Sequence, residues 1–130
     1  MRELCECAVS EALKLGLSQE RGDRLRLAVE EGAVNVCRYA YRNGEGEIEI
    51  SVNEEHGLVV VRLADEGTPF NPLSVAEPDV ARSIREGKAG GLGIHLMKSM
   101  ADGVAYRREG ARNILKLAFT KAVGEDDDTR

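Results

Sequence analysis

The chain has 130 residues, of which 42% are hydrophobic and 32% charged, and its formal net charge is −5. This length suits one domain with one core, and no apolar run approaches the roughly 20 residues that a membrane span needs. There is no basic stripe with interleaved aromatic residues, which argues against direct nucleic-acid binding. The N-terminus lacks the apolar stretch of a secretory signal, so the cytoplasm is the expected location.

The three cysteines, Cys5, Cys7 and Cys37, cannot all pair within one chain. Cys5 and Cys7 are too close together for a structural disulfide, and Cys37 falls on an apolar stripe of a predicted helix. The two histidines show no zinc-binding spacing to the cysteines. We therefore expect reduced cysteines that serve in packing.

The first part of the chain predicts two helices. Residues 2–15 carry apolar side chains at spacings of about four, and Gly16 then ends the helix. Ser18, three residues before Arg21, is a weak N-cap signal. The helix over residues 20–42 has the clearest pattern, because apolar or small residues recur at helical spacing, at positions 25, 28, 29, 32, 33, 36, 37 and 40.

The rest of the chain predicts two β-hairpins with a loop and a helix between them. Alternating or β-branched apolar residues indicate strands that pair in sequence, 48–52 with 58–64 and 104–108 with 113–119. Between the hairpins lie a loop at 65–72, a stretch without clear pattern at 73–86 for which a short helix is one interpretation, a glycine-rich segment at 87–93 and a helix at 94–101.

This order of elements predicts an α+β fold. Strands that come in hairpin pairs favour a mostly antiparallel sheet, and helices with one apolar side would cover one face of it in a two-layer sandwich. The expected domain spans residues 1–121. Residues 122–130 contain the acidic run Glu125 to Asp128, and we expect them to form a solvated, disordered tail.

A first candidate site lies on the long predicted helix, at Glu31 and Asn35. Residues four apart share one helical face. Asparagine is a poor residue for the middle of a helix, because its amide competes for backbone hydrogen bonds. A residue that disfavours the local structure in this way indicates a functional role. An amide oxygen can complete the shell of Mg²⁺, and a nearby carboxylate can act as a general base. Taken alone, both side chains could equally be ordinary surface residues.

A second candidate site follows the apolar strand, at Asp65-Glu66-Gly67-Thr68-Pro69-Phe70-Asn71-Pro72. A carboxylate at the end of a strand can accept a hydrogen bond from an exocyclic amine, and Gly67 lets the backbone approach closely. The same residue types also favour a plain turn, so this segment alone leaves both interpretations open.

A third candidate site is the segment Gly87-Lys88-Ala89-Gly90-Gly91-Leu92-Gly93, which leads into a helix. Glycines let backbone N–H groups approach phosphate oxygens, and the N-terminus of the next helix adds free donors. Lys88 adds a positive charge. The segment matches neither the Walker A spacing nor the dinucleotide-binding fingerprint, and a flexible linker is the alternative.

Together and in this order, the three motifs resemble the GHKL (Bergerat-fold) ATPase superfamily. The N box would be Glu31 to Asn35, the first glycine box Asp65-Glu66-Gly67 and the second Gly90-Gly91-Leu92-Gly93. The pattern Asp65-x-Gly67-x-Pro69-Phe70-x-Pro72, a short lid and the helix end Tyr39-Ala40-Tyr41 are similar to the anti-sigma-factor serine kinase branch. The similarity covers about residues 5–120.

The resemblance implies a role for each matching residue. Glu31 would be the general base and Asn35 the Mg²⁺ ligand. Asp65 would accept a hydrogen bond from the adenine amine, and Gly67 would support that pocket. The glycine-rich segment would bind the phosphates, with backbone contacts at Gly91 and Gly93, and its expected nucleotide-binding residues are Lys88, Gly90, Gly91, Leu92 and Gly93.

The resemblance also implies an activity and its partners. ATP and Mg²⁺ would be the cofactors of a serine/threonine protein kinase that phosphorylates a small antagonist protein and sequesters a sigma factor. Neither a membrane nor nucleic acid is an expected direct partner. The uncovered edge of such a sheet can recruit a second copy, so the sequence leaves a homodimer open.

Two positions depart from the family pattern. Tyr39 occupies a place where many relatives have histidine, and Arg112-Asn113 stands where many superfamily members have threonine. We interpret both departures as changes in the tuning of the phosphate site that leave nucleotide binding itself intact.

Two alternatives remain at this stage. The first is a regulatory module that binds a nucleotide and a partner without phosphoryl transfer, although a module that only clamps has less need of a base such as Glu31. The second is the catalytic domain of a histidine kinase or a larger GHKL protein. It ranks lower, because the sequence shows no helical hairpin that would carry a phosphorylated histidine.

Overall fold

The structure is a computed structural model that describes residues 2–41, 46–74 and 92–121. Two helices and a following helical turn make up the first part of the protein. They are α1 (Arg2–Lys14), α2 (Gln19–Asn35) and the π-helical turn η1 (Val36–Ala40). Gly16 ends the first helix with a φ of 105°, which favours glycine. Ser18 Oγ accepts a hydrogen bond from the backbone N–H of Arg21 at 3.2 Å, which confirms the predicted N-cap.

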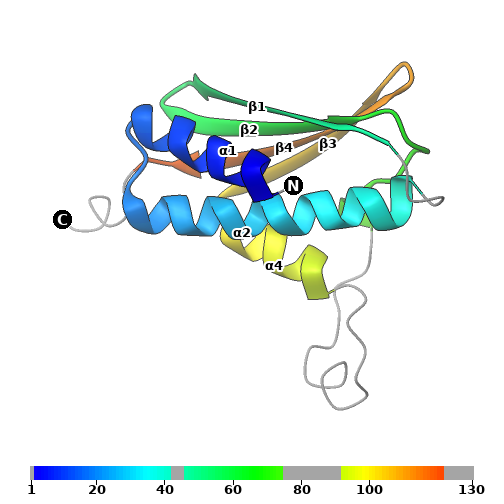
Figure 1. Ribbon diagram of the computed structural model, residues 1–130, viewed down its shortest axis with the longest axis horizontal. Helices are drawn as coiled ribbons and strands as arrows, with labels where there is room; N and C mark the ends of the chain where they lie inside the picture. The colour runs from blue at the N-terminus through cyan, green and yellow to red at the C-terminus, as the bar shows by residue number, and fades with distance from the viewer. Residues whose placement is uncertain (1, 42–45, 75–91, 122–130) are drawn as a thin grey trace, which may run out of the picture.

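Four strands, a short 3₁₀ turn and one more helix complete the described structure. The elements in chain order are β1 (Ile48–Glu55), β2 (Leu58–Asp65), η2 (Pro72–Ser74), α4 (Leu92–Met100), β3 (Gly103–Glu109) and β4 (Arg112–Thr120). The sheet order is β1-β2-β4-β3, and every neighbouring pair is antiparallel. The helices cover one face of this sheet (Figure 1), which confirms the predicted α+β sandwich.

The core lies between the helices and the sheet. It combines small and apolar residues of α1 and α2 with the inward-facing residues of β2 and β4, among them Leu25, Val29, Val59, Val61, Leu63, Leu117 and Phe119. Gly32 lets α2 approach the sheet closely, because a Cβ atom there would lie 3.3 Å from Leu63 Cδ2. This close approach sets the last turns of α2 against the end of β2, where the candidate residues lie.

The predicted helix over residues 20–42 is wrong in one respect, because α-helical geometry ends at Asn35. The following five residues form a π-helical turn, in which the N–H of Tyr41 donates to the carbonyl of Val36 at 3.0 Å. A π turn holds more residues than an α turn, so the helical phase shifts. Val36 and Ala40 stay buried, whereas Cys37 points to solvent and leaves the predicted apolar stripe.

The other two cysteines also differ from one another. Cys5 is fully buried in the core, and burial raises the pKa of its thiol, as expected for a packing residue. Cys7 is exposed. All three cysteines are free. Among the described residues, no helix combines the length and the apolar character that crossing a bilayer requires.

Candidate functional site

Glu31 and Asn35 lie one turn apart near the end of α2 and line one cavity. This cavity has a volume of about 240 Å³ and is lined by Glu31, Val34, Asn35, Arg38, Leu92, Gly93 and Leu96. Asn35 is only 6% exposed, and its Nδ2 donates to the backbone carbonyl of Glu31 at 2.9 Å. Because the amide nitrogen is engaged in the helix, the amide oxygen is the group that Asn35 offers to a ligand.

Gly93, at the start of α4, lies directly against the Glu31 carboxylate. A Cβ atom at Gly93 would be 2.4 Å from Glu31 Oε1, closer than a carbon and an oxygen can pack. The sequence associates Gly93 with phosphate binding alone. The structure adds a second reason for glycine, because a Cβ atom would displace the carboxylate from its present position between α2 and α4.

Asp65 occupies the end of β2 and is only 3% exposed. Its Oδ1 accepts two hydrogen bonds, from the backbone N–H of Gly67 at 2.9 Å and from Asn113 Nδ2 at 2.8 Å. A small cavity of about 20 Å³ adjoins this carboxylate, and it is lined by Gly32, Asn35, Val36, Ala40, Asp65, Phe70, Pro72, Tyr106, Asn113 and Leu115. A volume of this size holds little more than one water molecule, so a larger ligand would have to displace residues of the rim.

Asn35 lines both cavities, so its side chain lies between them. One is narrow, mostly apolar and closed by a buried carboxylate. The other is wider and contains Glu31 and the N-terminus of α4. The arrangement suits a ligand with a flat, mostly apolar end and an anionic end, because free N–H groups at the start of a helix favour anions.

Gly67 joins the loop after β2 to the π-helical turn. A Cβ atom at Gly67 would lie 2.5 Å from the carbonyl oxygen of Ala40, and the N–H of Thr68 donates to that same oxygen at 2.9 Å. Arg108 of β3 donates to the carbonyl of Gly67 at 2.9 Å. The loop is therefore held from two sides next to Asp65.

Replacing Gly67 with alanine is expected to destabilise the fold by about 1–3 kcal/mol, because the added methyl group meets backbone atoms that cannot move without breaking the Thr68 hydrogen bond. Thermal unfolding followed by circular dichroism would measure a drop of several degrees. Gly103→Ala is the matched control, since a Cβ atom there makes ordinary contact with Ala118 at 3.7 Å. An equal melting temperature for both variants would contradict this interpretation of Gly67.

Aromatic side chains surround the same loop. The rings of Tyr39 and Phe70 stack with centroids 4.7 Å apart, so the residue at the family's histidine position packs on the loop after Asp65. The hydroxyl of Tyr41 accepts from the N–H of Glu66 and donates to the carbonyl of Glu47, both at 2.8 Å. Tyr41 thus ties the end of η1 to the start of β1 and the end of β2.

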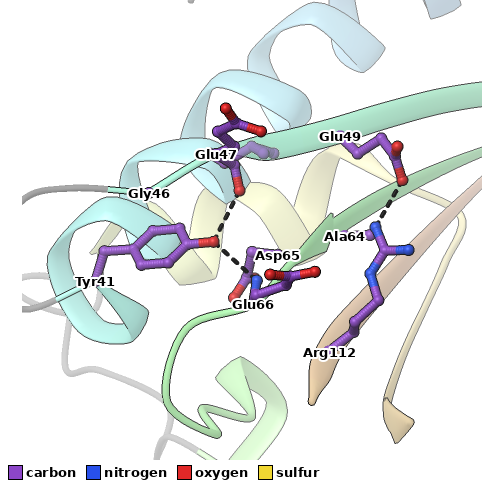
Figure 2. Close-up of a pocket in the computed structure, with 9 residues that line it drawn as sticks. Tyr41, Gly46, Glu47, Glu49, Ala64, Asp65, Glu66 and Arg112 are labelled. Atoms are coloured by element: carbon purple, nitrogen blue, oxygen red, sulfur yellow. Dashed lines mark hydrogen bonds and ion pairs between the residues drawn. The ribbon is translucent and has the colours of Figure 1, made fainter. Parts of the chain in front are cut away.

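A larger cavity, of about 530 Å³, lies beside this bridge (Figure 2). Its lining is rich in carboxylates and includes Tyr41, Gly46, Glu47, Ile48, Glu49, Ala64, Asp65, Glu66 and Arg112. Arg112 pairs with Glu49 at 2.6 Å. Glu31 and Asn35 do not line this cavity, so its size alone does not make it the candidate site.

Arg112-Asn113 was expected to affect the tuning of the phosphate site, but Asn113 contacts Asp65, the residue expected at the adenine. Asn113 is only 4% exposed, lies opposite Asp65 in the β2–β4 pair and donates to its carboxylate. Buried and partly exposed residues alternate along β4, and Asn113 lies on the buried, inward face with Leu115, Leu117 and Phe119. This alternation is the sequence signal for a buried Asn113. A polar residue at the buried end of that face indicates a hydrogen-bonding task.

Only part of the predicted glycine-rich segment, residues 87–93, falls within the described residues. Lys88, Gly90 and Gly91 lie outside the described residues, as does most of the segment 73–86. Leu92 and Gly93 form the first turn of α4, two residues earlier than predicted, and both line the cavity with Glu31. The tail at 122–130 also lies outside the described residues.

Comparison with known proteins places this geometry in a family. The sequence profile of the histidine kinase-like ATPase domain matches residues 1–119. A solved structure of the Acinetobacter baumannii histidine kinase AdeS superposes with a TM-score of 0.50 at 17% identity, over 78% of this chain and 48% of that one. This likeness concerns the fold alone.

Several similar curated proteins are named as serine kinases. Serine/threonine-protein kinase BtrW of Bordetella bronchiseptica is 28% identical over 99 residues, which cover 75% of this chain and 70% of BtrW. Serine-protein kinase RsbW of Bacillus subtilis is 27% identical over 126 residues, covering 91% and 77%. RsbW of Listeria monocytogenes is 29% identical over 120 residues, covering 88% and 74%.

The family match spans nearly the whole chain, and it confirms the resemblance that the three motifs indicated. Members of this family are ATP-binding domains, which agrees with a cleft that pairs a narrow pocket with a helix N-terminus. The chain belongs to the histidine kinase-like ATPase domain family, the GHKL type, and its relatives include bacterial serine kinases.

Proposed function

We propose that this chain is a cytoplasmic serine/threonine protein kinase of the anti-sigma-factor type, which transfers a phosphoryl group from ATP to a serine of a small antagonist protein and sequesters a sigma factor. One observation carries the proposal: Glu31 and Asn35, a turn apart on α2, line one cavity together with the first turn of α4. The relatives that are named as serine kinases support serine as the residue that accepts the phosphoryl group.

The residues of the cleft would have different roles in nucleotide binding. Asp65 and the narrow cavity would hold the adenine ring of the nucleotide. The N-terminus of α4, at Leu92 and Gly93, would hold phosphate oxygens through backbone N–H groups. Lys88, Gly90 and Gly91 remain proposed phosphate-binding residues from the sequence. The kinase domain would span residues 1–121.

The donor set of the site fits Mg²⁺. The described residues contain no cluster of three or more histidine, cysteine or acidic side chains that could hold a metal ion. Mg²⁺ in phosphoryl-transfer sites needs only one or two protein oxygens, because phosphates and waters complete its shell. The Asn35 oxygen meets that need, and the ion, when bound, would neutralise charge on the phosphates.

Glu31 would take the proton of the incoming serine. As the serine oxygen forms its bond to the γ-phosphorus, the bond from that phosphorus to the bridging oxygen breaks and ADP leaves with the electron pair. The serine proton passes to the Glu31 carboxylate. Most of the acceleration in such a transfer comes from positioning and charge neutralisation, and a general base adds about 10²–10⁴-fold.

The direct test is incubation of the protein with γ-labelled ATP and its candidate antagonist protein. The proposal predicts label on a serine of the antagonist. Binding of ATP and of the partner without label on either protein would favour the alternative, a regulatory module that binds a nucleotide without transferring phosphate.

Replacing Gly93 with alanine offers a second test that leaves Glu31 in the sequence. The methyl group would push the Glu31 carboxylate aside, since its Cβ would lie 2.4 Å from Oε1. Because a carboxylate at the end of a flexible side chain can move, the melting temperature should change by less than about 4 °C, which corresponds to about 1 kcal/mol. Transfer should fall about tenfold or more, since small misplacements of a catalytic group are costly. Unchanged transfer would show that the position of Glu31 is unimportant.

A further inference from the structure

Two exposed apolar side chains lie at the cavity that contains Glu31. Val34 of α2 is 41% exposed and Leu96 of α4 is 38% exposed, and both line this cavity. Leu4 is the other exposed large apolar side chain among the described residues, and it lies at a different cavity. A single exposed apolar residue needs no explanation, but a pair from two helices at one cavity indicates a contact surface.

The helical repeat places both side chains one turn away from the contact between Glu31 and Gly93. Val34 follows Glu31 by three residues on α2, and Leu96 follows Gly93 by three residues on α4. Positions three apart on a helix are neighbours, with Cβ atoms about 5–6 Å apart. A Cβ atom at Gly93 would lie 2.4 Å from Glu31 Oε1, so the two helices approach each other closely at this contact.

Val34 and Leu96 lie on opposite sides of the Glu31 carboxylate. The reason is that α2 and α4 run in roughly opposite directions (Figure 1), and each apolar residue lies one turn toward the C-terminus of its own helix. We call Val34 and Leu96 the flanking pair. A chain segment that brings a hydroxyl to Glu31 therefore comes within contact range of both members.

The geometry of an extended chain matches this spacing. A general base needs the serine oxygen within about 2.6–3.2 Å of the Glu31 carboxylate. In an extended segment, residues two apart point to the same side and are separated by about 6.5–7 Å. One helical turn is about 5.4 Å long, so the residues two positions before and after the serine would face the flanking pair. A polar side chain buried there would lose its water without gaining a partner from valine or leucine.

We propose that the flanking pair, Val34 and Leu96, is the docking site for the acceptor segment of the antagonist protein. This segment carries apolar side chains within two residues of its serine, on both sides, and they pack against the flanking pair when the serine reaches Glu31. The inference rests on the proposed function, because it defines the acceptor of the same site.

Leu96→Gln and Val34→Thr test the docking site, because each keeps roughly the size of the side chain and makes it polar. Initial rates of labelled phosphate transfer would be measured over a range of antagonist concentrations at saturating ATP. Each variant should raise the KM for the antagonist about fivefold or more and leave kcat within about twofold, the pattern of lost substrate binding. The ATP affinity measured by calorimetry should stay close to that of the wild type.

Leu4→Gln is the matched control, because it makes the same change at an exposed leucine that does not line the cavity with Glu31. Its KM for the antagonist should equal that of the wild type. A double-mutant cycle then tests the acceptor. Replacing an apolar residue within two positions of the labelled serine with glutamine should raise the KM of the wild-type kinase, and one of these replacements should have a much smaller effect in Leu96→Gln, because residues in contact couple.

An unchanged KM in either Leu96→Gln or Val34→Thr, or an equal rise in Leu4→Gln, would overturn the docking site. A fall in ATP affinity that accounts for the slower transfer would also overturn it, because the pair would then serve the nucleotide. A wild type that transfers no phosphate to the antagonist would instead contradict the proposed function. Should Leu96→Gln fail to fold by circular dichroism, Val34→Thr decides, and an unchanged KM there would overturn the docking site.

Discussion

Replacing Glu31 with alanine is expected to lower phosphoryl transfer about 10²–10⁴-fold while leaving ATP affinity nearly unchanged. The carboxylate lines the cavity at the start of α4 but would act only on the proton of the acceptor hydroxyl. Initial rates of labelled phosphate transfer to the antagonist protein measure the first effect, and calorimetry measures the second. A loss confined to the rate, with binding intact, is the signature of a general base.

Glu30 provides the matched control, because it is the adjacent carboxylate on the same helix and is not among the residues that line the cavity. Glu30→Ala changes net charge and helix composition in the same way as Glu31→Ala. It should transfer phosphate at a rate close to wild type. A normal transfer rate in Glu31→Ala, or equal losses in both variants, would refute the assignment of Glu31.

Replacing Asn35 with alanine is expected to abolish the contribution of Mg²⁺ to ATP binding. The Asn35 oxygen is the group that the described site offers to the ion, since its nitrogen is engaged with the Glu31 carbonyl. We expect ATP affinity in Mg²⁺ to fall about tenfold or more, and the difference between titrations with and without Mg²⁺ to vanish. Alanine is a better helix former than asparagine, so α2 should remain intact.

Asn35→Asp is the informative companion, because it keeps an oxygen at the same place and adds a charge that Mg²⁺ tolerates well. Its ATP affinity should still depend on Mg²⁺. Both variants should melt within a few degrees of wild type. If alanine at position 35 left the Mg²⁺ dependence unchanged, Asn35 would not be the metal ligand.

The arrangement of helices and strands could be predicted from local patterns. The four strands alternate or carry β-branched residues, and the hairpin turns are short, so both antiparallel pairs follow from the sequence. The position of α2 followed from its long apolar stripe. The π-helical turn at Val36–Ala40 could not be predicted this way, because a single extra residue per turn barely disturbs the spacing of small and apolar residues.

The candidate site was predictable where one element carries both residues. Glu31 and Asn35 share a helical face whatever the rest of the fold does, and the structure places both on one cavity. The Asp65–Asn113 pair was not predictable, because the two residues are 48 positions apart and only the register of β2 with β4 brings them together. The contact between Gly93 and Glu31 likewise depends on how α4 packs against α2.

We propose that an adenine nucleotide binds along the residues from Asp65 through Asn35 to Glu31. Titration of the protein with ATP by calorimetry, with and without Mg²⁺, tests it most directly. We predict binding of one ATP per chain with a Kd below about 1 mM, the upper range for enzyme substrates, and tighter binding when Mg²⁺ is present. Absence of any ATP uptake at several times that concentration would contradict the claim.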